Sequence, residues 1–423
     1  MLSALKLPGV RWILSLNAAD LALEYASSIA LMVLVYDATS SPIAAAAMLV
    51  AKQVVPGVLL AALGHWLEPV DPRRGLAAAY VLRGAAFLLL AAAAHGVALY
   101  FLALGAGLAG TSARVFIRTT VVRGTAGPLF RSVTAAQNLL LGAMTLIGPA
   151  IGALASGGLG AGPSMFLWAG AALGLAGVVQ SLPRALLVSR ASESDPHDAE
   201  SRPAGAGAEP REGVSVGGLL ALAGLLVCVF SMDEPALLAY VRGGLGGDAG
   251  TYGLILMVWG AGIMSGGALY ARFGVHATVT AIVLGVAASA AGYIGLGFAP
   301  TVAFALVAAF IGGNGNGAYW VAIVTTVLEA CPPGEEARAS GRLEGLGTAM
   351  PAVGIVLGGV MAELASPRMT LWLPGLVALV ALAVWTVGVR AAAGRAAVEL
   401  GGSHAGASAA APVAGATPAE VLA

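Results

Sequence analysis

The chain has 423 residues, of which 59% are hydrophobic and 10% are charged, and its formal net charge is zero. A soluble domain carries roughly 25% charged residues, so this composition excludes an ordinary water-soluble fold and predicts an all-α integral membrane protein. The balanced charge offers no basic surface for nucleic acid. The two cysteines, Cys228 and Cys331, form no pattern typical of a disulfide framework or a metal site.

Twelve apolar runs are long enough to cross a bilayer as helices, because about 20 apolar residues span roughly 30 Å of hydrocarbon. The first six cover residues 11–36, 42–67, 75–95, 97–122, 133–156 and 163–188. The second six cover residues 215–240, 250–272, 277–298, 301–329, 341–364 and 369–391. We therefore expect two pseudo-symmetric six-helix bundles, 1–188 and 215–391, with a transport site between them.

Two further segments are polar or low in complexity. Residues 189–214 are rich in Pro, Gly, Ala and Glu and nearly free of large apolar side chains, which predicts a disordered linker. Residues 392–423 form a Gly- and Ala-rich tail that is also predicted to be disordered.

The positions of lysine and arginine predict the orientation of the spans. If the N-terminus is cytoplasmic and the spans alternate, nearly all the cations near span ends fall inside, and only Arg242 and Arg368 fall outside. This bias is what the positive-inside rule requires. Both termini and the linker are thus predicted to be cytoplasmic, in a multi-pass protein of the cell membrane.

The loop after the second span reads Gly64-His-Trp-Leu-Glu68-Pro69-Val-Asp71-Pro-Arg73-Arg74. It resembles the signature between helices 2 and 3 of the major facilitator superfamily, and its surroundings look like the drug- and siderophore-exporting branch. Glu68 stands where the family usually has Asp, and Pro69 stands where it usually has a basic residue. Residues 267–274 look like a decayed repeat of this loop.

The resemblance implies a gate at the inner face. Gly64 would let a neighbouring helix pack closely, while Glu68, Asp71, Arg73 and Arg74 would form an ion cluster that breaks when the transporter changes state. Glu344, at the start of the eleventh span, is expected to join the cluster. The alternative is that the two arginines serve only as orientation signals.

The fifth span contains Gly148-Pro149-Ala-Ile-Gly152. This run resembles the antiporter signature of the same superfamily, which implies export in exchange for protons. Proline removes a backbone hydrogen bond and kinks a helix. Gly148, Pro149 and Gly152 are therefore predicted to form a pivot.

Acidic and polar side chains interrupt the apolar runs and call for a reason, because they are costly in hydrocarbon. Asn17, Asp20 and Glu24 lie on one stripe of the first span, and Asp233 and Glu234 lie in the seventh, its counterpart. A desolvated carboxyl group can bind and release a proton near neutral pH or pair with a cationic substrate. The alternative is a structural pair with a basic residue such as Lys52.

Other polar residues within the spans have candidate roles as well. Arg114 lies deep in the fourth span and is expected to pair with a carboxylate in a structural or gating role, whereas Arg118 reaches the inner interface. Asn314 and Asn316 in the tenth span either line the central cavity or satisfy backbone groups at a helix irregularity.

The sequence therefore predicts a monomeric secondary transporter in the lipid bilayer, powered by the proton gradient and without cofactor or metal. The favoured activity is proton-coupled efflux of a small drug-like molecule or secondary metabolite, with cationic or zwitterionic compounds preferred by the acidic residues. One alternative is uptake or facilitated transport of a small solute or lysolipid. A polytopic membrane enzyme or receptor is a remote alternative, because the five histidines are scattered over loops and tails.

Overall fold

A computed structural model describes residues 8–67, 69–93, 96–124, 127–181, 216–274, 278–329 and 336–409, and all of its regular structure in these ranges is helical. The first half of the chain forms the N-half. Its elements are α1 (Pro8–Thr39), α2 (Pro42–Leu49), η2 (Val50–Val54), α3 (Val55–Leu63), η3 (Gly64–Leu67), α4 (Pro72–Ala93), α5 (Val97–Gly124), α6 (Gly127–Leu159) and α7 (Ala161–Ser181).

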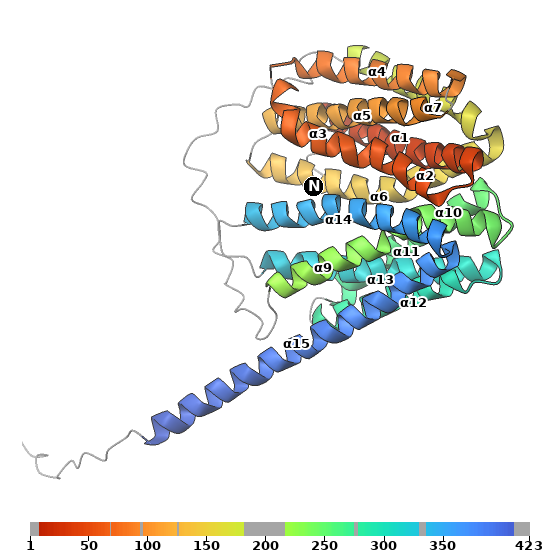
Figure 1. Cartoon of the computed structure of the whole chain (residues 1–423). Helices are drawn as coiled ribbons and strands as arrows, with labels where there is room; N and C mark the ends of the chain where they lie inside the picture. The colour runs from red at the N-terminus through yellow and green to blue at the C-terminus, as the bar shows by residue number, and fades with distance from the viewer. Residues whose placement is uncertain are drawn as a thin grey trace, which may run out of the picture.

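The second half of the chain forms the C-half, which lies below the N-half in Figure 1. Its elements are α9 (Val216–Phe230), α10 (Asp233–Gly243), α11 (Ala249–Leu269), η5 (Tyr270–Gly274), α12 (Thr278–Gly297), α13 (Val302–Glu329), α14 (Glu336–Leu364) and α15 (Pro367–Ala409). Because α2, η2 and α3 form one span and α9 and α10 form another, the described residues give six spans in each half, as the sequence predicts.

The spans begin and end where local sequence requires it. Ser41 caps α2 by accepting a hydrogen bond from the Ala44 amide, and Pro42 follows at the first helical position, where no backbone N–H is needed. Asp248 caps α11 in the same way through the Thr251 amide. These residues set the short turns that return the chain into the membrane.

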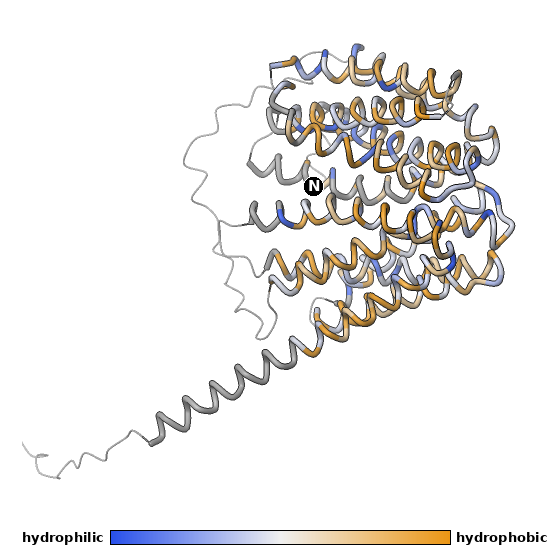
Figure 2. The backbone as a smooth tube through the Cα atoms, viewed as in Figure 1, coloured by the Kyte–Doolittle hydropathy of each residue, from blue (hydrophilic) through white to orange (hydrophobic). Residues whose placement is uncertain are grey.

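The surface of the bundle matches a lipid environment. Among the described residues, ten of the spans are long and apolar enough to cross a membrane by length and composition alone, and α6 and α13 are the two that fall short of that criterion. Large apolar side chains are exposed on many of them, including Leu82, Phe101, Leu154, Leu284 and Val384, and Figure 2 shows the apolar character running along the helices. The protein is therefore a multi-pass membrane protein.

The two halves pack closely at one end of the bundle. We call the end where α7 stops and α9 starts the linker end, and the opposite end, which holds Thr39 and Gly243, the distal end. Helix α6 packs on α11, and α2 packs on α14. Small residues make this approach possible, because a side chain at Gly253 would overlap Ala153, and one at Gly359 would overlap Ala46.

Polar contacts join the halves at the same distal end. Arg242 at the end of α10 forms an ion pair of 2.8 Å with Asp37 near the end of α1. The Ser41 hydroxyl donates a 2.8 Å hydrogen bond to Glu363 of α14, and the Ile43 amide donates to the same carboxylate. A carboxylate from one half thus caps a helix of the other.

The C-terminal boundary differs from the sequence prediction. Residues 392–423 were expected to be a disordered tail, but α15 continues to Ala409. Residues 391–400 hold five alanines together with Arg395, Glu399 and Leu400, and the helix propensity of these residues extends α15 beyond the apolar span. The predicted linker, 189–214, lies outside the described residues.

Candidate functional site

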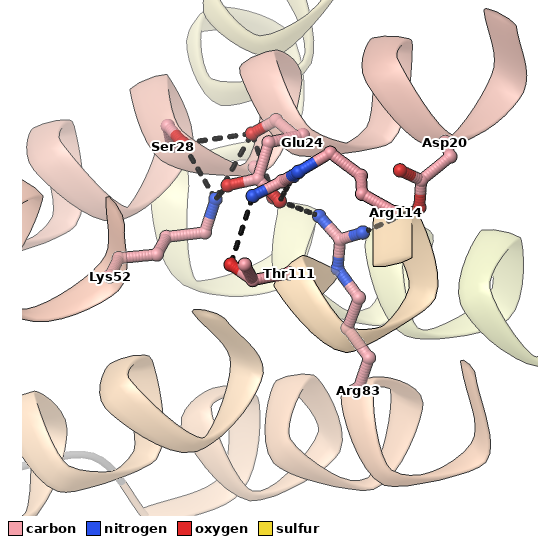
Figure 3. A network of polar contacts seen from close by, with 8 residues as sticks. Asp20, Glu24, Ser28, Lys52, Arg83, Thr111 and Arg114 are labelled. Atoms are coloured by element: carbon pink, nitrogen blue, oxygen red, sulfur yellow. Dashed lines mark hydrogen bonds and ion pairs between the residues drawn. The ribbon is translucent and has the colours of Figure 1, made fainter. Parts of the chain in front are cut away.

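Five ionisable side chains meet in the middle of the N-half, and Figure 3 shows them converging from four spans. Asp20 and Glu24 come from adjacent turns of α1, because residues four apart share a helix face. Lys52 comes from η2, Arg83 from α4 and Arg114 from α5. Asp20, Lys52 and Arg83 are buried almost completely.

Glu24 is the centre of this cluster. Its Oε1 lies 2.8 Å from Lys52 Nζ, while its Oε2 lies 2.6 Å from Arg83 Nη2 and 3.1 Å from Arg114 Nη1. Lys52 also donates to the Glu24 carbonyl at 3.0 Å and to the Ser28 hydroxyl at 2.6 Å. Three cations therefore hold Glu24 ionised, since burial is tolerated when a charge is paired and hydrogen-bonded.

Asp20 has a sparser environment. Its Oδ1 lies 3.1 Å from Arg83 Nη1, and its Oδ2 is buried without a hydrogen-bond partner. The Tyr80 hydroxyl lies beside Asp20, and neither this hydroxyl nor Arg83 Nε meets a partner at hydrogen-bond geometry. Arg83 thus bridges the two carboxylates of α1.

The backbone is shaped to fit the cluster. Lys52 lies in a π-helical turn, a geometry that often marks functional positions in helices. Gly110 on α5 leaves room for the carboxylate, because a Cβ atom there would lie 2.8 Å from Glu24 Oε2. Gly107, one turn earlier, packs directly against the Lys52 carbonyl.

The cluster carries an excess of positive charge. Asp20 and Glu24 supply two negative charges and Lys52, Arg83 and Arg114 supply three positive ones, so the sum is about +1 when all five are ionised. Arg114 is the accessible member, because its side chain is 32% exposed while that of Arg83 is fully buried. Arg114 is therefore the residue through which a ligand can reach the net positive charge of the cluster.

A second group of acidic residues lies in the C-half, where the seventh span is broken. The chain turns at Ser231 and Met232, and α10 starts at Asp233. Pro235 has no backbone N–H, so it cannot continue the hydrogen bonding of α9 but fits the first turn of α10. Asp233 and Glu234 occupy that first turn, where the helix dipole favours negative charge.

Aromatic residues rather than cations surround this pair. In the described part of the chain, no Lys or Arg nitrogen lies within 4.0 Å of either carboxylate. The Tyr293 ring stacks on Phe230 with centroids 4.5 Å apart, and Trp259 meets Tyr293 edge-on at 4.8 Å. The C-half site thus carries up to two negative charges beside an aromatic cluster.

Tyr293 links the cluster to Asp233. Its hydroxyl oxygen lies 3.1 Å from Asp233 Oδ2 and 3.0 Å from the Phe230 carbonyl oxygen. Because a hydroxyl has a single proton, it donates to one of these acceptors at a time. The Tyr252 hydroxyl is also buried and has no hydrogen-bond partner among the described residues. It lies close enough to both carboxylates to interact with their charges.

The remaining predicted site residues are spread around these two groups. Asn17 is buried one turn before Asp20 on α1. Asn314 donates a 2.9 Å hydrogen bond to Ser265, which ties α13 to α11. Asn316 is partly buried two residues further on. The contact of Asn314 is of the structural kind, between tightly packed helices.

The predicted gate loop contacts its own half in the described residues. Asp71 caps α4 by accepting from the Arg74 amide at 3.0 Å, and Arg73 donates to the Gln180 carbonyl at the end of α7. Gly64 lies in η3. Glu68 and the side chain of Glu344 lie outside the described residues, so the gate role stays a prediction.

The predicted pivot lies between α6 and the first span. Pro149 is inside α6, as predicted. Gly148 packs on Tyr25, and Gly152 packs on Ala26, both on α1. The next residue, Ala153, meets Gly253 of α11 across the halves, so the motif lies where three helices pass one another.

Two site residues were missed by the sequence interpretation. Arg83 sits alone inside the third apolar run, which is the same signal that singles out Asp20 and Glu24. Tyr293 carries no such signal, because a tyrosine in an apolar run resembles ordinary packing. Only its position in space beside Asp233 reveals it.

Comparisons with known proteins agree with this architecture. A family model described as Major Facilitator Superfamily matches residues 13–341 and again residues 235–417. No curated protein matches the sequence.

Several solved structures are similar in fold. One is a bacterial homolog of the human lysosomal transporter Spinster in an inward-facing, occupied conformation, with 13% identity, a TM-score of 0.69, and coverage of 91% of this chain and 97% of that one. Another is a POT family transporter in complex with 5-aminolevulinic acid, with 12% identity, a TM-score of 0.67, and coverage of 90% and 95%. A third is the nucleoside transporter NupG, with 11% identity, a TM-score of 0.64, and coverage of 90% and 99%.

Proposed function

We propose a function from one premise: the chain belongs to the Major Facilitator Superfamily, and it is a transporter rather than an enzyme. On this premise we propose that it exports a small molecule bearing a cationic group in exchange for protons, by alternating access. The linker end is then cytoplasmic, and the distal end faces outward. The observation that carries the proposal is the Tyr293–Asp233 contact.

The conformation fits one stage of that cycle. The distal end is closed by the packing of α6 on α11 and α2 on α14, and by the Asp37–Arg242 ion pair. A transporter closed at its outer end is open or ready to open inward, which is the stage at which an exporter loads substrate. The solved structure of the Spinster homolog, which is similar in fold, is likewise inward-facing.

Asp233 is the best candidate for the proton carrier because its neighbours serve both protonation states. When the carboxylate is ionised, the Tyr293 hydroxyl donates to it. When it is protonated, it can donate to the Tyr293 oxygen while that hydroxyl donates to the Phe230 carbonyl. Protonation therefore exchanges partners within the trio: the Phe230 carbonyl receives the Tyr293 proton when Asp233 is protonated and gives it up when Asp233 is ionised.

The carboxylates of the N-half are less suited to this duty. Glu24 is bound by three cations, so protonating it would leave their charges uncompensated. Asp20 is fully buried and paired with Arg83. We assign these residues to holding the N-half together and positioning Arg114.

Exchange follows from competition for Asp233. A cationic group of the substrate pairs with the ionised carboxylate and lies against the aromatic cluster, where cation–π attraction adds to the ion pair. A proton neutralises the same carboxylate and removes the attraction. Substrate and proton therefore bind in turn, which gives antiport, and the inward proton gradient powers export.

Everted membrane vesicles test this proposal directly. The chain is produced in a bacterial host lacking its main efflux pumps, and respiration acidifies the vesicle interior, which a pH-sensitive dye reports. Amine-bearing compounds should raise the interior pH as they exchange for protons, and Asp233→Asn should abolish this response. Asp248→Asn, which retains a helix-capping side chain, serves as the control and should respond like the unaltered chain.

Two outcomes would contradict the proposal. An undiminished pH response in Asp233→Asn would show that Asp233 is not the proton carrier. A compound that enters right-side-out vesicles together with protons would favour uptake, the second candidate function. Similar folds include peptide transporters and a nucleoside transporter, so peptide-like and nucleoside-like solutes belong among the compounds tried in that assay.

A further inference from the structure

The electrostatic difference between the halves points to the chemistry of the substrate. We propose that the substrate is a zwitterion, whose cationic group binds at Asp233 and whose anionic group binds Arg114. This inference rests on the proposed transport site between the halves, and it adds a second, opposite pole to that site. Arg114 then acts as the residue that sets specificity.

Arg114 has the capacity to bind an anion. A guanidinium has five N–H donors. In the described structure, Nη1 contacts Glu24 at 3.1 Å and Nη2 donates to Thr111 Oγ1 at 3.0 Å. The other donors remain available on a side chain that is 32% exposed. Planar, forked donors of this kind are suited to carboxylate and phosphate groups.

The neighbouring charges leave Arg114 uncompensated. Glu24 is the carboxylate that contacts it, and Lys52 and Arg83 contact the same carboxylate at 2.8 and 2.6 Å. Asp20 compensates only one further charge. The cluster therefore keeps a net positive charge of about one, and the accessible guanidinium is where a ligand anion can neutralise it.

The C-half supplies the opposite pole. Asp233 and Glu234 have no cationic partner within 4.0 Å among the described residues, and the buried Tyr252 hydroxyl beside them lacks a hydrogen-bond partner. Among the described residues, the titratable groups that interact with Asp233 are Glu234, Tyr293 and Tyr252, and Tyr319 interacts with Tyr293. A ligand cation would compensate one negative charge of the acidic pair and lie beside Trp259, which is partly exposed.

The two poles lie at similar depth. The Asp37–Arg242 ion pair fixes α1 and α10 in register at the distal end. Glu24 precedes Asp37 by about 13 residues and Asp233 precedes Arg242 by about 9, so at about 1.5 Å per residue their depths differ by only about 6 Å. Similar depth is what one small molecule needs in order to present opposite charges to both halves, and the chain lengths of the probe compounds below measure the separation across the membrane plane.

A ligand that touches both poles also joins the two halves. Its cation would be held by the C-half and its anion by the N-half, whereas a compound with a single charge would bind only one of them. The zwitterion is therefore expected to bind most tightly in the conformation that brings both halves together around it.

Matched compounds test the inference. The probes are ω-amino acids of four to eight carbons, each with and without a phenyl substituent. Every one is compared with its amide, which keeps only the cation, and its N-acetyl form, which keeps only the anion. Binding to the purified full chain in detergent is measured by calorimetry. The best zwitterion should bind at least about tenfold more tightly than its amide or N-acetyl form.

Variants of Arg114 locate the anion pole. Arg114→Gln should weaken binding of the zwitterion by about tenfold and leave binding of the amide unchanged, and Arg114→Lys should restore part of the loss. Arg118→Gln is the matched control, because Arg118 is exposed one turn further along α5. Thermal unfolding of each variant verifies that it is folded.

Three results would overturn the inference: equal binding of amide and zwitterion, unchanged zwitterion binding in Arg114→Gln, or no binding by any zwitterion in the series. The proposed antiport fails separately. It is refuted when Asp233→Asn keeps its vesicle response, whatever the Arg114 variants show. Conversely, an amine without an anionic group could be exchanged for protons in a way that depends on Asp233 and is unchanged in Arg114→Gln. That result would refute the zwitterion proposal and leave the proposed antiport intact.

Discussion

The two halves share a helical plan but treat charge in opposite ways. In the N-half, both carboxylates are paired with cations, and four of the five ionisable groups are buried. In the C-half, Asp233 and Glu234 lie at a helix break among aromatic rings. A paired network holds its geometry and resists a change of protonation, whereas an unpaired carboxylate responds to protons and ligands. We therefore call the N-half, with its paired cluster around Glu24, the fixed half. We call the C-half, with Asp233 and Glu234, the responsive half.

The largest effect is expected from breaking the fixed half. Arg83→Gln removes the cation that is paired with Asp20. It also removes one of the three cations that contact Glu24. Removing one partner from a buried ion pair typically costs about 3–5 kcal/mol. The variant should unfold at a markedly lower temperature in detergent or fail to accumulate. Adding Asp20→Asn removes the stranded charge and should recover part of the loss.

An unchanged unfolding temperature in Arg83→Gln would mean that the network contributes little to stability. If Asp20→Asn gave no recovery, the cost would come from lost packing around Arg83 rather than from an uncompensated charge. Either result would remove the distinction between a fixed and a responsive half.

The next effect concerns the contact between the halves. Gly253→Leu places a side chain where Ala153 lies, and such overpacking costs about 1–3 kcal/mol. The cost falls on the distally closed state, so the population should shift away from it. Spin labels at Ser40→Cys and Gly243→Cys, where a side chain meets no neighbour at position 243, should then report a longer distal distance in a cysteine-free background than without Gly253→Leu. The same distance in both proteins would contradict this account of the interface.

A smaller effect is expected at the surface of that interface. The Asp37–Arg242 pair is partly exposed, with side-chain exposures of 44% and 30%. Surface ion pairs contribute about 0.2–1 kcal/mol, so Asp37→Asn should lengthen the same spin-label distance only slightly. High salt should mimic the substitution, because screening weakens exposed pairs. A shift as large as that of Gly253→Leu would show that the ion pair, rather than the small-residue packing, closes the distal end.

Only a small effect on stability is expected in the responsive half. Asp233→Asn removes one of two adjacent negative charges and breaks no ion pair in the described residues, so the free energy of unfolding should change by no more than about 1.5 kcal/mol, the contribution of its hydrogen bond with Tyr293. The loss of antiport should nevertheless be complete. A large loss of stability would place Asp233 in a structural role and contradict the contrast with Arg83.

Much of the fold could be predicted from the sequence. Span length is set by bilayer thickness, so the apolar runs gave the twelve spans with boundaries close to the observed ones. Prolines and caps such as Pro235, Ser41 and Asp248 act locally and are readable in the sequence. The end of α15 was misjudged, because helix propensity after residue 390 is independent of the apolar pattern that marks a span.

The candidate site was predictable only in part. A charge in an apolar run is conspicuous, so Asp20, Glu24 and Asp233 stood out, and the pairing of Arg114 with a carboxylate is confirmed by its contact with Glu24. Which carboxylate is paired depends on neighbours far away in the chain. Arg83 reaches Glu24 from 59 residues away, and Tyr293 reaches Asp233 from 60 residues away. Sequence spacing holds no information on such contacts.

The central claim is that substrate and proton compete for Asp233. The most direct measurement is proton release when substrate binds to the purified protein in a weakly buffered detergent solution. The compound giving the largest vesicle response is added, and the change in pH is recorded. The account predicts release of about one proton or less per molecule bound, as expected for a single site, and no release from Asp233→Asn. Binding without any release, or equal release from Asp233→Asn, would contradict it.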